Sequence, residues 1–457
     1  MAELPATAVA ETLAQRIAAS RGRALPAAVV ERAEEMLIDI AGLCVAARAS
    51  DYVRAAIDGW EADGGATVIG HRRRLDAAGA AFVNGTAAHG EDFDDTFEGG
   101  PVHAGVVMVP AILAAAERHR IGGADSLFGL AVGVETMCRL SLVAPKLFHK
   151  AGFHPTAVLG AMGAAAGVAT ALRLPAAQLV DALGVAGSLA SGIIEYLAEG
   201  TWTKRLHPGW AAQSGLRAVD LARHGFKGPR TVFEGTHGLL HGFANTANGD
   251  WDALLGDFGT RWVAETIAFK PYACGTMTHP YVDCAKRLAA RGIRPEDVAS
   301  IVCEVGEGTV HRLWEPLAAK QRPPNAYAAK FSQPYCIAAG FVLGDAGLDA
   351  FTEARVNDAR LVALAGKVRY VVDPGNPYPR EYTGHVRATL TDGRVVEERQ
   401  PHLRGGAHEK LPRAEIEAKF LRNAAHGGWA PSLAGRFLDL ARGAFARDTI
   451  DLAPFRA

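Results

Sequence analysis

Acidic side chains crowd one short segment of the chain. Five ionisable groups fall within the eight residues 89–96: His89, Glu91, Asp92, Asp94 and Asp95. Burying so many ionisable groups together is costly unless they are paired or do chemistry. One interpretation is a solvated acidic loop, since charge runs usually face water. Another is a magnesium or calcium site, although the segment lacks the glycine-centred, twelve-residue spacing of a calcium loop. A functional segment is the third.

His154 stands at the start of a glycine-rich apolar stretch. Pro155 follows it directly, and proline suits the first turn of a helix. A helix N-terminus attracts anions, and a histidine there can give a proton to a bound acid or take one from it. The alternative is a histidine that only caps the helix.

Three basic side chains lie within four residues further along the chain. Lys204, Arg205 and His207 follow the hydroxyl of Thr203. Lysine offers a point charge and arginine a fork of donors, so the group suits a substrate that bears carboxylates. The same residues would equally suit a surface loop.

Two later motifs combine lysine with aromatic and hydroxyl side chains. Lys270 opens the sequence Lys-Pro-Tyr-Ala-Cys with His279 just behind it, and Lys330 precedes Ser332 and Tyr335. The first motif lies at the expected junction of two domains, where ligand clefts tend to lie. The sequence contains neither a nucleotide-binding glycine motif nor a Gly-x-Ser-x-Gly nucleophile elbow.

The chain as a whole has an ordinary globular composition. It has 457 residues, 49% hydrophobic and 21% charged, with a formal net charge of −1. Without concentrated positive charge, we expect no nucleic-acid partner and no membrane binding. Residues 156–172 are the segment most like a membrane span, but they are short and rich in Ala and Gly, which favours a buried helix.

Six cysteines are scattered along the chain without a Cys-x-x-Cys pair. This usage indicates a reducing cytosol rather than a disulfide scaffold, and it weighs against iron–sulfur and structural zinc sites. Residues 1–5 do not lead from a basic region into an apolar run, so we expect no signal peptide. We therefore predict a cytoplasmic protein without a metal.

Apolar periodicity indicates the elements that must position these residues. Helical patterns follow one another near residues 75–90, 106–120, 123–143, 156–172, 176–196 and 209–225. Strand patterns appear at residues 300–305, 367–372, 385–391 and 394–400, the last two joined by Asp392-Gly393. Helical patterns resume from Pro412. We predict two domains: a large all-α helical bundle, residues 1–266 and 405–457, and a smaller inserted α/β domain, residues 267–404.

Five colinear motifs cover about residues 30–425: Asp92-Phe-Asp-Asp-Thr96, Gly152-Phe-His154-Pro-Thr156, Thr203-Lys204 with Leu206-His207, Phe269-Lys270-Pro-Tyr272, and Lys330-Phe-Ser332 before Tyr335. Their order resembles the MmgE/PrpD family, which includes 2-methylcitrate dehydratase, cis-aconitate decarboxylase and iminodisuccinate epimerase. The resemblance implies that the α/β domain is a lid, that the protein is a homodimer and that it needs no cofactor. Phe97 stands where the methylcitrate dehydratases have a tryptophan, which weighs against methylcitrate as the substrate.

The resemblance also implies which residues line the active site. The family acts on small di- or tricarboxylates through carbanion- or enolate-like states, so cations must hold carboxylates while other groups move a proton. We predict six catalytic residues: Asp92, His103, His154, Lys204, Lys270 and Tyr335. We expect five residues to bind the substrate: Thr96, Thr203, Arg205, His207 and His279.

Three hypotheses of function result. The first is a cofactor-independent lyase, most simply a dehydratase of a hydroxylated polycarboxylate, in which substrate carboxylates would bridge Lys204 and Lys270. The second is an epimerase, an isomerase or a decarboxylase of the same fold. The third, more remote, is a non-catalytic carboxylate-binding protein, because fold membership alone does not establish activity.

Overall fold

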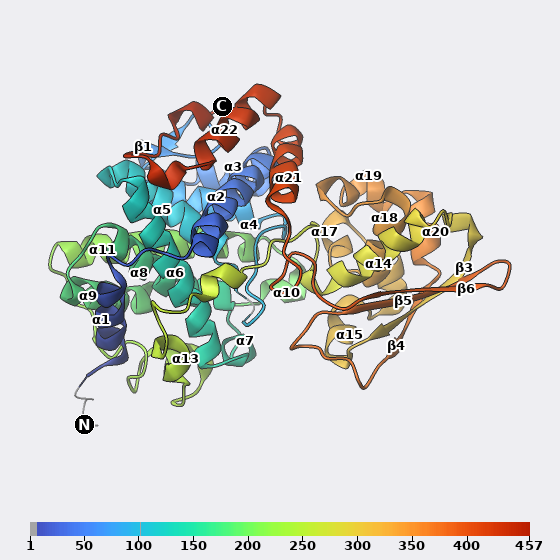
Figure 1. The fold of residues 1–457 in the computed structure, drawn as a ribbon, viewed down its shortest axis with the longest axis horizontal. Helices are drawn as coiled ribbons and strands as arrows, with labels where there is room; N and C mark the ends of the chain where they lie inside the picture. The colour runs from blue at the N-terminus through green and yellow to red at the C-terminus, as the bar shows by residue number, and fades with distance from the viewer. Residues whose placement is uncertain (1–6, 101) are drawn as a thin grey trace. The chain divides into compact units, whose positions relative to one another are not determined.

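The computed structural model describes residues 7–100 and 102–457, so the residues on which the signal-peptide prediction rests lie outside the described part. The chain divides into two compact units (Figure 1). Unit 1 runs to Gly90, continues over Asp94–Ile267 and ends with Pro412–Ala457. Unit 2 comprises Ala268–Leu411 together with the three residues Glu91–Phe93.

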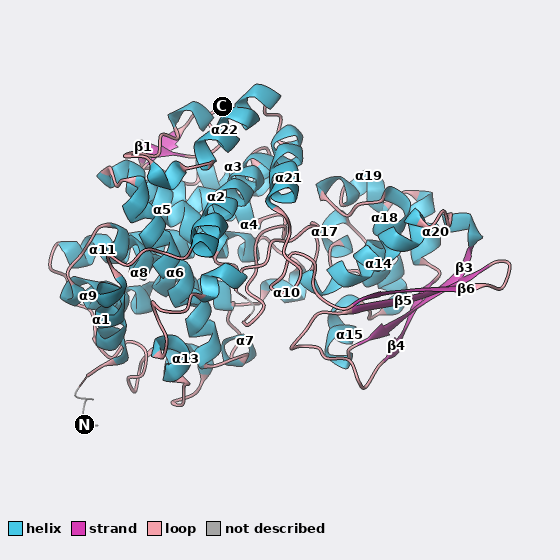
Figure 2. Ribbon diagram, in the orientation of Figure 1, coloured by secondary structure: helices cyan, strands magenta, loops and turns pink. Residues whose placement is uncertain are grey.

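Unit 1 is almost entirely helical (Figure 2). Its α-helices are α1 (Val9–Ser20), α2 (Ala27–Ala47), α3 (Asp51–Asp58), α4 (Ala77–His89), α5 (Gly105–His119), α6 (Gly123–Val143), α7 (Leu147–Lys150), α8 (Pro155–Ala171), α9 (Ala176–Leu189), α10 (Tyr196–Glu199), α11 (Thr203–Arg223), α12 (Leu239–Ala244), α13 (Trp251–Leu255), α21 (Arg413–His426) and α22 (Pro431–Ala441). An antiparallel pair of short strands, β1 (Asp63–Thr67) and β2 (Arg74–Leu75), also belongs to it. The prediction of a mostly helical unit is confirmed.

Helix α8 is buried along its whole length. It packs on α6 and α11, and glycines allow the helices to approach closely. A Cβ atom at Gly163 would lie 2.8 Å from the carbonyl oxygen of Gly133, and one at Gly167 would lie 2.7 Å from that of Gly129. The prediction that this glycine-rich stretch forms a buried helix is confirmed.

One described helix, α6, is long and apolar enough to cross a membrane by length and composition alone. In the sequence, residues 156–172 are the segment most like a membrane span, but the helix they form, α8, has only 17 residues. Because 83% of the most apolar window of α6 is buried inside the structure, a core helix is the better interpretation.

A four-stranded mixed sheet forms the framework of unit 2. Its strands are β3 (Val298–Val305), β4 (Val368–Val372), β5 (Gly384–Leu390) and β6 (Val395–Gln400), in the order β4-β3-β5-β6. Strands β3 and β4 are parallel, whereas β5 runs antiparallel to both β3 and β6. All four predicted strands are present, and Gly393 takes the positive φ (87°) expected of the turn between β5 and β6.

Helices cover this sheet. Those of unit 2 are α14 (His279–Ala290), α15 (Glu307–Leu313), α16 (Leu317–Gln321), α17 (Ala326–Ala329), α18 (Gln333–Leu343), α19 (Glu353–Val356) and α20 (Ala359–Ala365). Helix α14 packs on β5 and β6, and α18 packs on α14. The predicted alternation of β5 is present, since Val386, Ala388 and Leu390 are buried while Arg387 is exposed.

Helix α11 differs from its prediction in one way that matters for the site. It begins at Thr203, six residues before the predicted start, so Lys204 and Arg205 lie in its first turn and not in a loop. Pro208 and Gly209 break the helical pattern in the sequence, yet both lie inside the helix. Gly209 is required there because a Cβ atom would lie 2.0 Å from the carbonyl oxygen of Phe82 in α4.

Candidate active site

A cluster of histidines and aspartates lies in unit 1, and all but the partly exposed His103 are buried: His89, Asp94, Asp95, His103, His154 and His207. Helix ends supply three of them: His89 ends α4, His154 precedes α8, and His207 lies near the start of α11. The ring centres lie 5.0 Å apart for His89 and His103, 5.8 Å for His89 and His154, and 5.2 Å for His154 and His207. Two predicted catalytic histidines, His103 and His154, are therefore neighbours.

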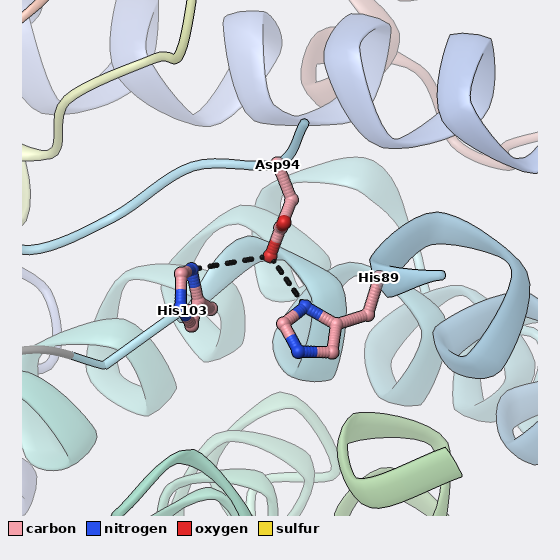
Figure 3. A group of neighbouring side chains, drawn as sticks. All are labelled: His89, Asp94 and His103. Carbon is pink, nitrogen blue, oxygen red and sulfur yellow. Dashed lines mark hydrogen bonds and ion pairs between the residues drawn. The ribbon is translucent and has the colours of Figure 1, made fainter. Parts of the chain in front are cut away.

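One carboxylate orients two of these rings. Oδ2 of Asp94 lies 2.8 Å from Nδ1 of His89 and 3.2 Å from Nδ1 of His103, as Figure 3 shows. Nδ1 of His103 also lies 2.6 Å from the carbonyl oxygen of Asp95. Because these partners are acceptors, Nδ1 of each ring carries the proton and Nε2 carries the lone pair. Nε2 of His103 is thus the ring atom that can accept a proton.

Asp95 has a different task. Its fully buried carboxylate accepts the backbone N–H groups of Ala104 and Gly105, at 3.0 and 2.9 Å, at the start of α5. Burial and the charge of Asp94 raise the pKa of Asp95 to about 7. A Cβ atom on Gly105 would lie 2.4 Å from Oδ1 of Asp95, so only glycine lets the chain pass this close. Asp95 thereby fixes the turn that carries His103.

The two remaining histidines are paired with each other. Nδ1 of His154 lies 3.1 Å from Nδ1 of His207, so one ring donates and the other accepts. Burial, aided by the positive charge of Lys204, lowers the pKa of His207 to about 3. Burial, aided by the neighbouring histidines and Lys204, places the pKa of His154 well below its ordinary value. Both rings are therefore neutral at pH 7, and His154 does not cap α8 with its side chain.

The other predicted residues of unit 1 differ in their exposure and in their contacts. Lys204 is half-buried and close enough to act on both His154 and His207. The guanidinium of Arg205 lies 4.4 Å from the ring centre of Tyr52, in a cation–π contact. Two more positions complete the group: Thr96 is buried and Thr203 is exposed. Substrate binding by Thr96, Thr203 and Arg205 stays a prediction.

Lysines of unit 2 hold the other half of the acidic segment. Nζ of Lys270 lies 3.2 Å from Oδ1 of Asp92 and 3.1 Å from its carbonyl oxygen. Nζ of Lys330 lies 2.9 Å from Oε2 of Glu91 and 2.6 Å from its carbonyl oxygen. Asp92 has a left-handed backbone, with φ at 54°. The interpretation of the segment as a solvated acidic loop is therefore wrong, because its carboxylates are paired and Asp92, Asp94 and Asp95 are buried.

Two predicted residues of unit 2 have their polar atoms engaged elsewhere. The buried hydroxyl of Tyr335 donates to the carbonyl oxygen of Ala350 at 2.7 Å, and burial raises its pKa. A role for Tyr335 as proton donor stays a prediction and requires that hydrogen bond to open. His279 is buried and donates from Nε2 to the carbonyl oxygen of Cys274 at 3.1 Å. Its predicted contact with substrate would have to use the opposite ring edge.

A metal ion is a further possibility for the cluster in unit 1. One donor atom from each of His89, Asp94 and His103 lies within 4.8 Å of the other two (Figure 3), which is close enough to share an ion. Nδ1 of His89 already donates to Asp94 and Nδ1 of His103 to the carbonyl oxygen of Asp95, so both Nδ1 atoms have hydrogen-bond partners without a cation. The prediction that the protein needs no metal stays open to a chelation test.

Sequence reasoning placed neither His89 nor Asp94 nor Lys330 among the site residues. The signal for the first two was the acidic segment itself, whose charges needed partners. Lys330 lies in the fifth motif, but no spacing rule links it to a residue 239 positions away.

The chain matches two family domains and is similar to several known proteins. Residues 11–252 match the MmgE/PrpD N-terminal domain and residues 272–430 match the MmgE/PrpD C-terminal domain. The chain is 30% identical over 364 residues to the cis-aconitate decarboxylase of Mus musculus, covering 77% of this chain and 72% of that protein. It is 29% identical over 416 residues to the cis-aconitate decarboxylase of Homo sapiens, covering 87% and 84%. A cis-aconitate decarboxylase-like protein of Aspergillus oryzae is 28% identical over 401 residues, covering 82% of each chain.

Proposed function

Because the chain belongs to the MmgE/PrpD family, we propose that it is a lyase acting on a small tricarboxylate, with decarboxylation of cis-aconitate as the first candidate reaction. The resemblance drawn from the five motifs is confirmed by the family match. The relatives that carry the name cis-aconitate decarboxylase, at 28–30% identity, support this choice over the dehydratase that sequence reasoning favoured. The dehydratase and the epimerase remain alternatives that the same experiment distinguishes.

Decarboxylation requires two kinds of groups in the protein. The bond between a carbon atom and its carboxylate breaks, CO₂ leaves, and the electron pair passes into the remaining unsaturated acid, where a carbon atom takes up a proton. Cationic groups must hold the other carboxylates and stabilise the charge that develops, a role we assign to Lys204 and Lys270. A positioned group must deliver the proton, and here His103 is the first candidate, with Asp92 beside Lys270 as the second.

The observation that carries the proposal is the set of oriented imidazoles around Asp94. A side chain moves protons efficiently when its tautomer and direction are fixed, and the carbonyl oxygen of Asp95 together with the Asp94 carboxylate fixes both for His103. His103 is also partly accessible, with 12% of its side chain exposed, whereas the side chain of His89 is fully buried. We therefore assign the proton transfer to His103 and the support of its partner carboxylate to His89.

The test is to incubate purified protein with cis-aconitate, citrate, methylcitrate and malate while following released CO₂ and the proton NMR spectrum in D₂O. We expect CO₂ from cis-aconitate and one deuterium in the unsaturated product. Gain or loss of water without CO₂ would identify a dehydratase, and deuterium in recovered substrate alone would identify an epimerase. Folded protein that turns over none of these acids would contradict the lyase.

A matched pair of variants links any activity to this cluster. His103→Asn removes the proposed proton donor, whereas His237→Asn makes the same change at an exposed histidine of unit 1. Only the first should abolish turnover. Equal activity of the two variants would show that His103 is not the donor.

We also propose that the protein is a cytoplasmic homodimer. All six cysteines are free and buried thiols, which suits a reducing compartment. Four large apolar side chains near α10 and the start of α11 are exposed, as an interface would require: Ile193, Leu197, Trp202 and Trp210. Light scattering on the purified protein and cell fractionation test the two statements, and a monomer or a secreted protein would contradict them.

A further inference from the structure

Two lysines of unit 2 converge on one three-residue turn. Lys270 and Lys330 each donate to a backbone carbonyl oxygen and to the side-chain carboxylate of the same residue, Asp92 for the first and Glu91 for the second. Both lysine side chains are 2% exposed. An ammonium group so deeply buried needs a fixed partner, so each pair defines where its acidic residue must lie.

The turn itself is strained. Asp92 has φ at 54°, in the left-handed region that residues other than glycine seldom occupy. Such a conformation persists only where surrounding contacts hold it, and it is commonly found at functional sites. Lys330 contacts Glu91, the residue immediately before the strained Asp92, and Lys270 contacts Asp92 itself.

A backbone hydrogen bond joins the two segments that carry these lysines. The carbonyl oxygen of Lys330 accepts the N–H of Gly275 at 3.0 Å, five residues after Lys270. The Nζ atom of Lys330 also lies 5.6 Å from the ring centre of Phe351, which limits where its side chain can go. Lys330 is therefore a rigid anchor for the turn.

We propose that Lys330 is a positioning residue for the reaction. By holding both the carbonyl oxygen and the carboxylate of Glu91, it keeps Asp92 in its left-handed conformation, with the Asp92 carboxylate beside the ammonium of Lys270. Lys330 needs no contact with substrate for this role. The kinetic test of this role rests on the proposed function, whereas a second test, by hydrogen exchange, needs no substrate.

The test compares Lys330→Met with Lys367→Met in the full-length protein. Lys367 is a matched control, because its Nζ atom also donates to two carbonyl oxygens of unit 2, those of Pro295 and Val298, away from the turn. We expect Lys330→Met to lower kcat about 10- to 100-fold while KM changes less than about threefold, since a misplaced catalytic group costs rate more than binding. Lys367→Met should lower the melting temperature and leave kcat unchanged.

Hydrogen exchange supplies the readout that needs no substrate. Backbone amides of residues 91–94 should exchange at least about tenfold faster in Lys330→Met and at the wild-type rate in Lys367→Met, because only the first releases the turn. Lys330→Arg keeps a charged donor and should recover part of both the protection and kcat.

Each outcome decides a different statement. Folded Lys330→Met with wild-type kcat and wild-type exchange at residues 91–94 overturns the positioning role. If the wild-type protein turns over no acid, the proposed function fails, and the exchange rates alone decide whether Lys330 holds the turn. Should Lys330→Met not fold, Glu91→Gln replaces it, since the Glu91 side chain is 25% exposed and tolerates the change. Unaltered exchange and kcat in Glu91→Gln would then refute the proposal.

Discussion

Replacing Asp94 by asparagine tests the histidine cluster most directly. The change keeps the size of the side chain and removes the negative charge that lies 3.2 Å from Nδ1 of His103 and 2.8 Å from Nδ1 of His89. A hydrogen-bond or ion-pair contact with a charged group this close is worth about 1.5–3 kcal/mol. If His103 carries the transferred proton, its imidazolium loses about that much stabilisation, and turnover should fall about 10- to 100-fold.

The assay is the pH dependence of kcat on cis-aconitate. Since the negative charge of Asp94 favours the protonated ring, Asp94→Asn should move the limb of the profile on which His103 loses its proton to lower pH. Asp181→Asn is the control, because Asp181 is also buried in unit 1 but pairs with Lys227, at 3.0 Å, instead of a histidine. An unmoved limb and turnover within twofold of wild type in folded Asp94→Asn would refute the reasoning.

Three further predictions follow from the same contacts. Lys204→Met and Lys270→Met should each lower turnover about 10²–10³-fold, as the loss of about 2–4 kcal/mol of transition-state stabilisation implies. Steady-state kinetics with thermal melts should show that only Lys270→Met also lowers the melting temperature, because it leaves the buried Asp92 carboxylate without that ammonium group. Asp95 has a folded-state pKa of about 7 against 3.8 when unfolded, so ionisation of this carboxyl destabilises the folded protein as pH rises between these values. Asp95→Asn lacks this penalty, so urea unfolding should show its free energy of unfolding rising relative to that of the wild type by up to about 4 kcal/mol from pH 4 to 8. A chelator should change neither turnover nor melting temperature, and a loss that a divalent ion restores would identify His89, Asp94 and His103 as a metal site.

Regular patterns made much of the fold predictable. The strands of unit 2 alternate buried and exposed residues, and Asp392-Gly393 forces a turn, so both hairpin strands could be located. The start of α11 could not, because Pro208 and Gly209 normally end a helix. The close approach of Phe82 in α4, 127 residues earlier in the chain, explains why this helix contains Gly209.

The residue types that make up the site could be predicted from the sequence, but the partner of each side chain could not. The acidic segment contains four carboxylates that look alike in the sequence, yet Asp94 meets histidines while Asp92 meets Lys270, 178 residues away. No local pattern encodes such long-range pairing. For the same reason the sequence placed His89 in the acidic segment but did not show that its ring shares a carboxylate with His103.

The neutral pair of histidines bears on which acids the site favours. His207 has a pKa of about 3, so one carboxylate of a bound acid, raising it by about 1–3 units, would bring it to about 4–6. That leaves the ring mostly neutral at pH 7. Two carboxylates close to the rings would bring the pKa near 7, and the histidine pair would then take up a proton from solvent as the acid binds. We infer that a tricarboxylate bound beside these rings would cause the His154–His207 pair to take up a proton, whereas a monocarboxylate would bind without proton uptake. Calorimetric binding in buffers of different ionisation enthalpy measures that uptake directly, and equal uptake for acetate and for a non-reactive tricarboxylate would contradict the inference.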